Sequence, residues 1–424
     1  METKVLYVGF SMIGDPDATG QTLYSFFSKV NNISIFQLCL DYDSNRHSNA
    51  FKVCYLSKAR SLYCWLKKLY RSDSLKSATS SEIFQDSNRI KGTPIVALAR
   101  AILDVLPKRL AANDRDEIVK FQPDVIYTLG ENISTLKIVL HYSKKFNVPI
   151  VIHVMDNLDD SVYSYWKITS PFRRYYHKLL DQLYQRASSN LAISPKMAKE
   201  YSRRHKCHFS FAMNCIDKIH YQPSSLLSEK LHMVFSGGLH GGRDKILCKI
   251  GRTIQQSDFL RERIDLTVYT SLESHRNNIL LSDCGVVVKQ YVSRDDYFKN
   301  LSSFDILVHV ESFEVDKITY FAYSMSTKIP EYLSVGRPIF VVGPREICSV
   351  EYLESTHAAY LAASLDDIEN VLFEIANDKT GMIKKGKNAV IFAEKDFKSE
   401  ITAQRVEKIL IESVSNWQQR KNVD

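Results

Sequence analysis

The stretch Met233-Val-Phe-Ser-Gly-Gly-Leu-His-Gly-Gly-Arg243 decides the fold of this chain. It begins with an apolar run of strand length, continues through four glycines, and leads at Arg243 into a segment of helical period. Short apolar runs flanked by helical segments are typical of strands buried on both faces, which belong to parallel, helix-covered sheets. The sequence therefore predicts a doubly wound α/β fold.

The same alternation occurs twice along the chain. A first series starts at Val5, and a second restarts at Met233 after a polar linker. We expect two Rossmann-like domains facing a cleft, with ligands at the carboxyl ends of the strands. The predicted parts are an N-terminal domain at 1–212, a linker at 213–230 and a C-terminal domain at 231–390. The predicted strands are 5–10, 33–38, 125–129, 150–154, 191–193, 233–235, 266–269, 306–310 and 339–342.

Length and composition agree with two globular domains. The 424 residues include 56 Lys and Arg against 48 Asp and Glu, and the net charge of +8 favours anionic partners such as nucleotides, nucleic acid or lipid headgroups. The eight cysteines form no C-x-x-C pair, so we expect reduced, buried thiols in a cytosolic protein. Without a leader-like start or an apolar run of membrane length, we expect a chain that is neither secreted nor membrane-spanning.

A basic, aromatic insertion at about 52–117 interrupts the first series. Within 52–76, Trp65 falls on an apolar helical face with three leucines, while Lys67, Lys68 and Arg71 fall on the other faces. This composition suits a helix lying on an anionic membrane surface, where it would meet an acceptor. The alternative, equally open, is an ordinary amphipathic helix with a solvated basic face.

Two glycine-containing loops are candidate phosphate sites. The first, Gly14 to Gly20, lacks the spacing of a dinucleotide fingerprint, so Gly20 is either a phosphate contact or a turn residue. The second contains Gly238 and Gly241 and ends in Arg243. Bare backbone N–H groups before a helix can bind a diphosphate, and the guanidinium can add a bidentate contact.

The segment from Ser324 to Gly343 contains a helix that opens near Pro330 and ends at Gly336. It resembles the nucleotide-binding half of retaining GT-B glycosyltransferases, whose donor motif has a Glu, an apolar or aromatic pair, a small residue, Gly, a basic residue and Pro. The resemblance implies that Glu331 accepts hydrogen bonds from the ribose hydroxyls. It extends to the 213–217 segment, the glycine loop and the stretch after Val288.

The same resemblance implies further roles. His153 and Asp156 match the cluster that faces the sugar from the N-domain, and residues 391–424 match the C-terminal helix that returns to that domain. The implied donor-binding residues are Gly20, Gly238, Gly241, Arg243, Ser326, Thr327, Lys328 and Glu331; His153, Asp156 and Arg243 are the candidate catalytic residues. Retaining GT-B enzymes in general use no metal, so we expect no metal and no cofactor.

Two departures from the family pattern affect the donor site. Tyr323 stands where the family often has an earlier acid, and Leu239 occupies the first basic position of the diphosphate loop. Lys328 could replace the missing cation, or it could be a surface residue at the helix start. A metal site at His205, Cys207 and His208 is rejected, because adjacent ligands on one segment do not readily close a tetrahedron.

The leading hypothesis is a hexosyltransferase-type glycosyltransferase that moves a sugar, with retention, from a UDP- or GDP-sugar to a glycan or lipid-linked acceptor of surface polysaccharide or glycoconjugate synthesis. We expect it in the cytoplasm, with peripheral attachment to the inner membrane face. One alternative is a nucleotide-sugar 2-epimerase of the same fold. Another is a basic nucleic-acid-binding protein, disfavoured because no nucleic-acid module accompanies the charge.

Overall fold

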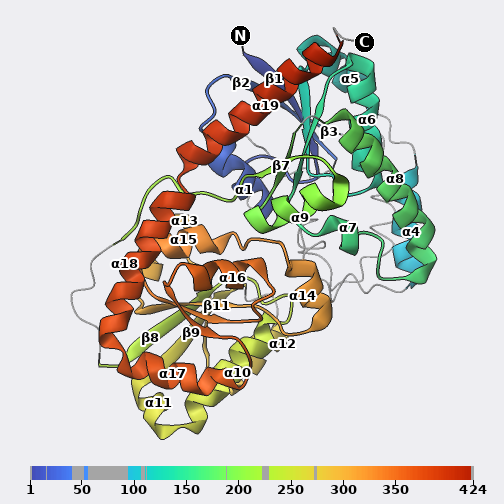
Figure 1. The fold of residues 1–424 in the computed structure, drawn as a ribbon. Helices are drawn as coiled ribbons and strands as arrows, with labels where there is room; N and C mark the ends of the chain where they lie inside the picture. Colours follow the sequence, from blue (N-terminus) through green and yellow to red (C-terminus); the bar gives the residue numbers. More distant parts are fainter. Residues whose placement is uncertain are drawn as a thin grey trace. The chain divides into compact units, whose positions relative to one another are not determined.

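The computed structural model describes residues 2–15, 17–40, 52–55, 94–106, 110, 112–187, 189–221, 229–271 and 275–421 (Figure 1). The chain divides into two compact units. Unit 1 contains Met1–Asn214 and Ser399–Asp424, and unit 2 contains Cys215–Lys398. The first division lies close to the predicted end of the N-terminal domain, and the returning C-terminal segment begins at Ser399 rather than at 391.

Unit 1 is built on a parallel sheet in the order β3-β2-β1-β4-β5-β6-β7. Val5 of β1 lies between Ile35 of β2 and Val125 of β4, so the apolar run after the N-terminus forms the middle of the sheet. The strand order reverses between β1 and β4. The strands are β1 (Thr3–Gly9), β2 (Ile33–Cys39), β3 (Lys52–Tyr55), β4 (Val125–Thr128), β5 (Ile150–Val154), β6 (Asn190–Ala192) and β7 (Phe209–Phe211).

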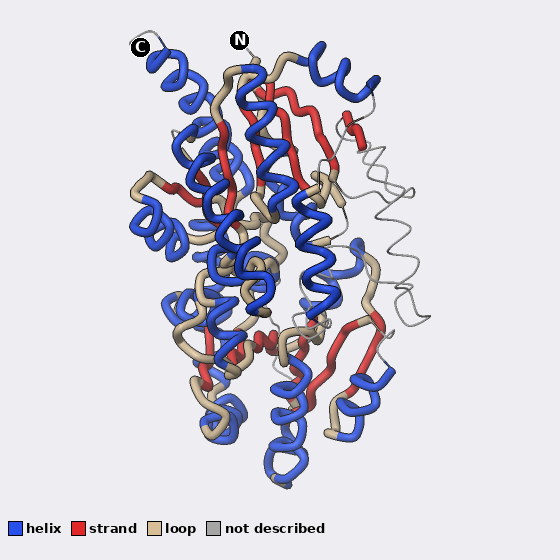
Figure 2. Tube along the Cα trace, turned by 90° about the vertical axis from the view of Figure 1, so that its right-hand side faces the viewer, coloured by secondary structure: helices blue, strands red, loops and turns tan. Residues whose placement is uncertain are grey.

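Helices cover this sheet, as Figure 2 shows. Ser194 caps α9 by accepting a hydrogen bond from the Met197 N–H at 3.0 Å, and Pro195 occupies the first turn, as the sequence predicted. The helices are α1 (Ala18–Phe27), α4 (Pro94–Val105), α5 (Ala112–Phe121), α6 (Ile133–Phe146), α7 (Leu158–Ser161), α8 (Ser170–Arg186), α9 (Pro195–His205) and α19 (Ser399–Lys421), with a 3-10 turn at Lys167–Thr169.

The C-terminal helix α19 belongs to unit 1. It packs against α1 and against β4 and β5. Near its end the Trp417 indole N–H donates to the Asn147 carbonyl at 2.8 Å, and the Arg186 guanidinium lies 4.9 Å from the Trp417 ring. These contacts fix the end of the chain on the first sheet.

Unit 2 has a second parallel sheet, in the order β10-β9-β8-β11-β12-β13. Its order reverses between β8 and β11. The strands are β8 (Leu231–Ser236), β9 (Ile264–Thr270), β10 (Val287–Gln290), β11 (Ile306–Val310), β12 (Ile339–Val342) and β13 (Ala359–Ala362). The helices are α10 (Arg243–Gln256), α11 (Asp258–Arg263), α12 (His275–Asp283), α13 (Arg294–Ser302), α14 (Val315–Phe321), α15 (Lys328–Val335), α16 (Cys348–Ser355), α17 (Asp367–Asn377) and α18 (Lys379–Asp396).

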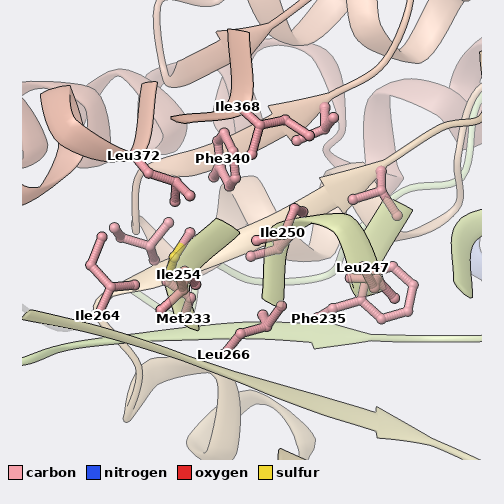
Figure 3. Close-up of a cluster of buried hydrophobic side chains, with 14 of the residues drawn as sticks. Met233, Phe235, Leu247, Ile250, Ile254, Ile264, Leu266, Phe340, Ile368 and Leu372 are labelled. Carbon is pink, nitrogen blue, oxygen red and sulfur yellow. The ribbon is translucent and has the colours of Figure 1, made fainter. Parts of the chain in front are cut away.

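The core of unit 2 fixes α10 on the sheet (Figure 3). Leu247, Ile250 and Ile254 recur at helical spacing on α10 and are buried with Phe235 of β8 and Phe340 of β12. Burying such side chains stabilises the unit by about 1.5–3 kcal/mol each. The start of α10, and with it the glycine loop, is therefore held in a fixed position relative to β8.

Some predicted elements were wrong or incomplete. The sequence patterns missed β3, β7, β10 and β13; β10, for example, is an edge strand that leaves Val287 48% exposed, so it has no continuous apolar run. The described part of the 52–117 insertion consists of β3, α4 and the first part of α5, so Lys52 begins a strand. Trp65, Lys67, Lys68 and Arg71 lie outside the described residues.

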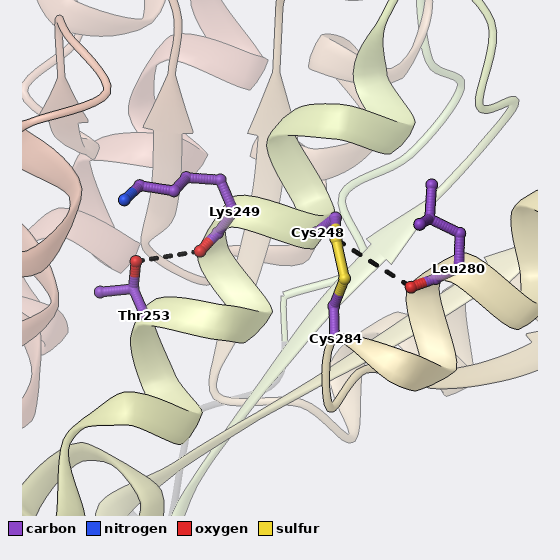
Figure 4. Close-up of a disulfide and its surroundings, with 5 residues drawn as sticks. All are labelled: Cys248, Lys249, Thr253, Leu280 and Cys284. Carbon is purple, nitrogen blue, oxygen red and sulfur yellow. Dashed lines mark hydrogen bonds between the residues drawn. A yellow bond between two sulfur atoms is a disulfide. The ribbon is translucent and has the colours of Figure 1, made fainter.

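The expectation that all thiols are reduced was also wrong. Cys248 of α10 forms a disulfide with Cys284, which follows α12, across a Cα–Cα distance of 5.3 Å (Figure 4). The two residues are 36 positions apart, and their proximity comes from the packing of α10 against α12. Cys207 is a free thiol. Among the helices that the structure describes, none combines the length and apolarity needed to cross a membrane.

Candidate functional site

The glycine loop of unit 2 lies where its strand order reverses. Residues 237–242 connect the end of β8 to α10, and Glu311 directly follows the neighbouring strand β11. In doubly wound sheets this reversal leaves a crevice at the carboxyl ends of the strands, where ligands bind. The residues that meet here come from the loop, from the start of α10, from the end of β11 and from the start of α15.

The loop requires glycine for two physical reasons. Gly241 and Gly242 have φ values of +72° and +83°, in the left-handed region that favours glycine. At Gly237 a Cβ atom would collide with the Nζ atom of Lys328, and at Gly242 it would lie 2.9 Å from the Ser312 hydroxyl oxygen. The missing side chains therefore let Lys328 and Ser312 approach the loop backbone.

Arg243, the first residue of α10, is held by the protein on all sides. Its Nε donates to the Val310 carbonyl at 3.3 Å, and its Nη2 lies 3.1 and 3.2 Å from the two carboxylate oxygens of Glu311. Its Nη1 donates to His240 Nε2 at 3.3 Å, and the guanidinium lies 5.6 Å from the centre of the Phe321 ring. Each guanidinium nitrogen thus has a partner inside unit 2.

Glu311 is buried and ionised. Burial alone would raise its pKa, but Arg243 and the nearby His309 outweigh this effect and lower the pKa to about 2. His309 Nε2 lies 3.3 Å from Glu311 Oε1 and 3.3 Å from the Ser349 hydroxyl oxygen. A carboxylate with an Arg and a His as neighbours forms a satisfied buried charge pair.

His240, within the glycine loop, is neutral. Burial lowers its pKa to about 3, and the charges of Arg243 and Lys328 contribute to this shift. Because Arg243 Nη1 donates to its Nε2, the proton of the neutral ring lies on Nδ1. His240 therefore holds the guanidinium in place without adding charge to the loop.

Lys328, the first residue of α15, lies across the loop. Its Nζ is 4.6 Å from the centre of the Phe235 ring and lies beside Gly237. Burial lowers its pKa to about 7; Arg243 contributes to this shift, while Glu311 and Glu331 oppose it. Lys328 is thus poised to gain a proton when an anion binds near pH 7.

The start of α15 carries the remaining predicted donor residues. Glu331 is half-buried in the first turn, one turn after Lys328, and Ser326 and Thr327 directly precede the helix and are half-buried. The next residue, Tyr332, accepts a hydrogen bond from the Ser236 N–H at 3.0 Å, which ties α15 to the end of β8. As predicted, Pro330 lies in the opening turn and the helix ends at Gly336, at φ +70°.

The other predicted site residues that the structure describes, His153, Asp156 and Gly20, belong to unit 1. His153 is fully buried in β5, with its Nδ1 2.5 Å from the Tyr127 hydroxyl, and burial lowers its pKa to about 3. Asp156 is partly exposed in the loop after β5. Gly20 is a buried residue of α1 whose N–H donates to Asp17 Oδ1 at 2.7 Å, and a Cβ there would lie 2.6 Å from the Met12 carbonyl oxygen. Packing and turn geometry account for Gly20.

Three residues of the cluster were not predicted from the sequence: His240, His309 and Glu311. His240 lies inside the glycine loop, but a single His there has no charge pattern of its own. His309 and Glu311 lie at the end of a predicted strand in Val308-His-Val-Glu311, and polar residues in an apolar run at a carboxyl edge were the available signal. The pairing of Glu311 with Arg243 spans 68 positions in the sequence, which no local pattern encodes.

The residues around the glycine loop suit an anion, whereas Glu331 suits a ligand with hydroxyl groups. Loop N–H groups, the N-terminus of the 14-residue α10 and Lys328 suit a phosphate, whereas the Glu331 carboxylate offers acceptors to hydroxyl donors. Within the described residues, no group of three His, Cys, Asp or Glu side chains is arranged to hold a metal ion. His205 pairs instead with Asp159, at 2.8 Å.

Comparisons with known proteins bear on the fold. No family model and no curated protein sequence matches the chain. Among solved structures, Anabaena HepE in complex with UDP matches with a TM-score of 0.63 at 13% identity, covering 97% of this chain and 100% of that one. S. aureus TarM, in complex with Fondaparinux, alpha-GlcNAc-glycerol and UDP, matches with a TM-score of 0.59 at 9% identity, covering 96% and 99%.

A third match is WaaG, described as a glycosyltransferase involved in lipopolysaccharide biosynthesis, with a TM-score of 0.57 at 11% identity and coverage of 96% and 99%. These structures match nearly the whole chain at identities that carry no information about substrates. They bear out the predicted architecture of two α/β units with parallel sheets. The chain therefore has the two-domain α/β fold of the GT-B glycosyltransferases.

Proposed function

We propose that this protein is a glycosyltransferase that takes a nucleoside diphosphate-sugar as its donor and binds it at the glycine loop of unit 2. The observation that carries the proposal is the convergence of Lys328, the bare backbone of Gly237 and the start of α10 at the reversal of the strand order. A diphosphate needs N–H donors and a cation at this position; the loop offers the N–H groups, and Lys328 of α15 offers the cation. HepE, a structure of the same fold, was solved with UDP-glucose, and this supports the donor class.

Within this proposal the residues have separate roles. Gly238 and Gly241 leave backbone N–H groups accessible to the diphosphate, and Lys328 contributes positive charge. Glu331 accepts hydrogen bonds from the ribose, with Ser326 and Thr327 beside it at the start of α15. Arg243 shapes the loop from the first turn of α10. Asp156 remains a candidate for contact with the sugar; the burial of His153 favours a structural role for that residue.

The acceptor and the stereochemical outcome belong to the same proposal. We infer a glycan or lipid-linked acceptor and a reaction with retention of the anomeric configuration, from the resemblance of the Ser324–Gly343 motif to retaining enzymes. Attachment to an anionic membrane surface has its support in the sequence alone, in Trp65, Lys67, Lys68 and Arg71. Replacing the three cations by Glu should abolish salt-sensitive sedimentation with anionic vesicles and leave UDP binding unchanged.

A transfer assay tests the proposed function. The protein is incubated with radiolabelled UDP- and GDP-sugars and a membrane extract, and label is counted in the lipid and glycan fractions. We expect label to enter one of these fractions with one donor, and we expect Lys328→Met to reduce it strongly. Lys245→Met, which replaces an exposed cation of α10, should leave it unchanged. Interconversion of the sugar nucleotide without an acceptor would instead indicate an epimerase.

A further inference from the structure

A buried carboxylate lies beside the loop that we assign to the diphosphate. Glu311 is 2% exposed and, being ionised, only accepts hydrogen bonds, as a phosphate does. A free carboxylate at this position would repel the donor. The role of Glu311 must therefore depend on the residue with which it is paired.

Glu311 binds Arg243. The Nη2 atom of Arg243 lies 3.1 and 3.2 Å from its two oxygens, and His309 Nε2 lies 3.3 Å from one of them. At this separation the negative charge of Glu311 offsets much of the attraction that Arg243 would exert on an anionic ligand. The positive charge of Arg243 is thus paired with a negative charge inside unit 2.

The geometry of Arg243 also limits its contact with a ligand. A bidentate contact to a phosphate uses two N–H groups on adjacent nitrogens of the guanidinium fork. Here Nε donates to Val310 and Nη1 donates to His240, in addition to the pairing of Nη2 with Glu311. Its side chain is 10% exposed. Each of the three guanidinium nitrogens therefore has a protein partner, and these contacts tie the start of α10 to the loop and to the end of β11.

Lys328 has the opposite surroundings. Its Nζ lies beside Gly237 and 4.6 Å from the Phe235 ring centre, in a half-buried position. The aromatic face accepts a cation without neutralising it. Lys328 therefore keeps its charge available to an anion that binds the loop.

We propose that Glu311 is a positioning residue, which neutralises Arg243 and fixes it as the anchor of the loop, so that Lys328 supplies the positive charge that binds the diphosphate. This inference rests on the proposed function, because it takes a nucleoside diphosphate-sugar as the ligand. It assigns to Glu311 a role in donor affinity. It also gives the two cations beside the loop different roles: Arg243 anchors the loop, and Lys328 contacts the ligand.

Donor affinity should depend on pH through the charge of Lys328. Lys328, with a pKa lowered by burial to about 7, carries its charge below pH 7 and loses it progressively above. An anionic donor favours the charged form, so donor affinity should fall as the pH rises above 7, by up to about tenfold per pH unit. The charged and titratable groups that act on Lys328 or are acted on by it are Arg243 of α10, Glu311 and His309 at the end of β11, His240 of the loop and Glu331 of α15.

Calorimetric titration of the full-length protein with UDP-glucose between pH 6 and 8.5 tests this. The diphosphate of UDP-glucose is esterified at both ends and does not titrate in this range. We expect wild-type affinity to fall by about tenfold or more between pH 6.5 and 8.5. Lys328→Met should bind weakly at every pH with a flat profile, while Lys245→Met should keep the wild-type profile.

The Glu311→Gln variant tests the positioning role. Gln keeps a hydrogen-bond acceptor for Arg243 and removes the negative charge, so the guanidinium charge becomes available to the ligand. We expect this variant to bind UDP-glucose several-fold more tightly than wild type at pH 8.5, where Lys328 is uncharged. Glu311→Asp keeps the negative charge, so this variant should show the same dependence of UDP-glucose affinity on pH as the wild type. A structural role alone predicts weaker binding by both variants at every pH.

The outcomes separate the two proposals. A flat wild-type profile, or wild-type affinity in Lys328→Met, overturns the role of Lys328. Weaker binding by Glu311→Gln at pH 8.5, with an unchanged melting temperature, overturns the role of Glu311. Failure of the wild type to bind either UDP-glucose or GDP-mannose at any pH contradicts the proposed donor site itself, and this inference with it.

Discussion

The Nζ atom of Lys328 lies 4.6 Å from the centre of the Phe235 ring, so a residue of α15 reaches back to the end of β8. Both segments were recognisable in the sequence, one as a strand running into glycines and the other as a helix opening near Pro330. The contact between them converts two separate motifs into one site. It also explains why a side chain at Gly237 cannot be accommodated.

Gly237→Ala should damage the site selectively. The added Cβ would collide with Lys328 Nζ, the mobile end of a flexible side chain, so Lys328 moves away and the fold survives. We expect UDP-glucose affinity to fall by about tenfold, equivalent to about 1.4 kcal/mol. Calorimetry checks this, with Gly285→Ala, where the added Cβ meets the Gln255 side chain near the C-terminal end of α10, as a glycine control. Unchanged affinity in Gly237→Ala would place the donor elsewhere.

Glu331→Ala should weaken donor binding. Loss of the acceptor leaves ribose hydroxyls without a partner, which costs roughly 1–3 kcal/mol of binding free energy. Melting temperature should change little, because Glu331 is half-buried at the start of α15. Glu354→Ala, which removes an exposed carboxylate paired with Arg345, is the matched control. A folded Glu331→Ala protein with wild-type affinity would exclude the ribose role.

Arg243→Met should destabilise unit 2 more than an ordinary surface substitution. It leaves Glu311 as an uncompensated buried charge, and breaking one partner of such a pair costs about 3–5 kcal/mol. Adding Glu311→Leu should recover much of the loss, because the unpaired charge is then gone. Urea unfolding of the two single variants and the double variant gives the coupling energy. Additive effects would show that the pair does not act as a unit.

Unit 1 should be less stable in mild acid than at neutral pH, because His153 is buried in its neutral form. Its pKa is lowered to about 3 in the folded state, whereas the unfolded residue has a pKa of about 6.5. Between these values the unfolded chain binds the extra proton, so stability falls as the pH falls below about 6.5, by up to about 1.4 kcal/mol per unit. Thermal melting at pH 7.5 and 5.5 should show a smaller pH effect in His153→Gln than in the exposed control His141→Gln. Equal pH effects would contradict the burial.

The disulfide should stabilise unit 2. A disulfide between residues 36 positions apart restricts the unfolded chain, which stabilises the folded state by roughly 2–4 kcal/mol. We expect the double variant Cys248→Ala/Cys284→Ala to have a lower melting temperature. We also expect mass spectrometry to find that neither cysteine is alkylated until the disulfide has been reduced. Cys348→Ala, at a buried cysteine outside this pair, serves as the comparison. Alkylation of Cys248 in the unreduced, denatured protein would show that the bond does not form.

The sequence predicted the parts of this protein that depend on local patterns. Buried parallel strands such as β1 and β11 are continuous apolar runs, and glycines, prolines and caps mark the ends of α9 and α15. Edge strands such as β10 escaped because exposed strands lack that pattern. In the site, Glu331 and Lys328 followed from one motif, whereas the partners of Arg243 did not. Glu311, His309 and the Cys248–Cys284 pair depend on which elements become neighbours, and that is fixed by packing across the whole unit.

Hydrogen exchange measured by mass spectrometry, with and without UDP-glucose, shows whether the donor binds at the glycine loop. We expect the ligand to slow exchange in peptides covering residues 236–243 and 326–334, where the loop N–H groups and the start of α15 bind the donor. Protection should be lost in Lys328→Met and kept in Lys245→Met. Protection confined to unit 1, or no protection at saturating UDP-glucose and GDP-mannose, would contradict a donor site at this loop.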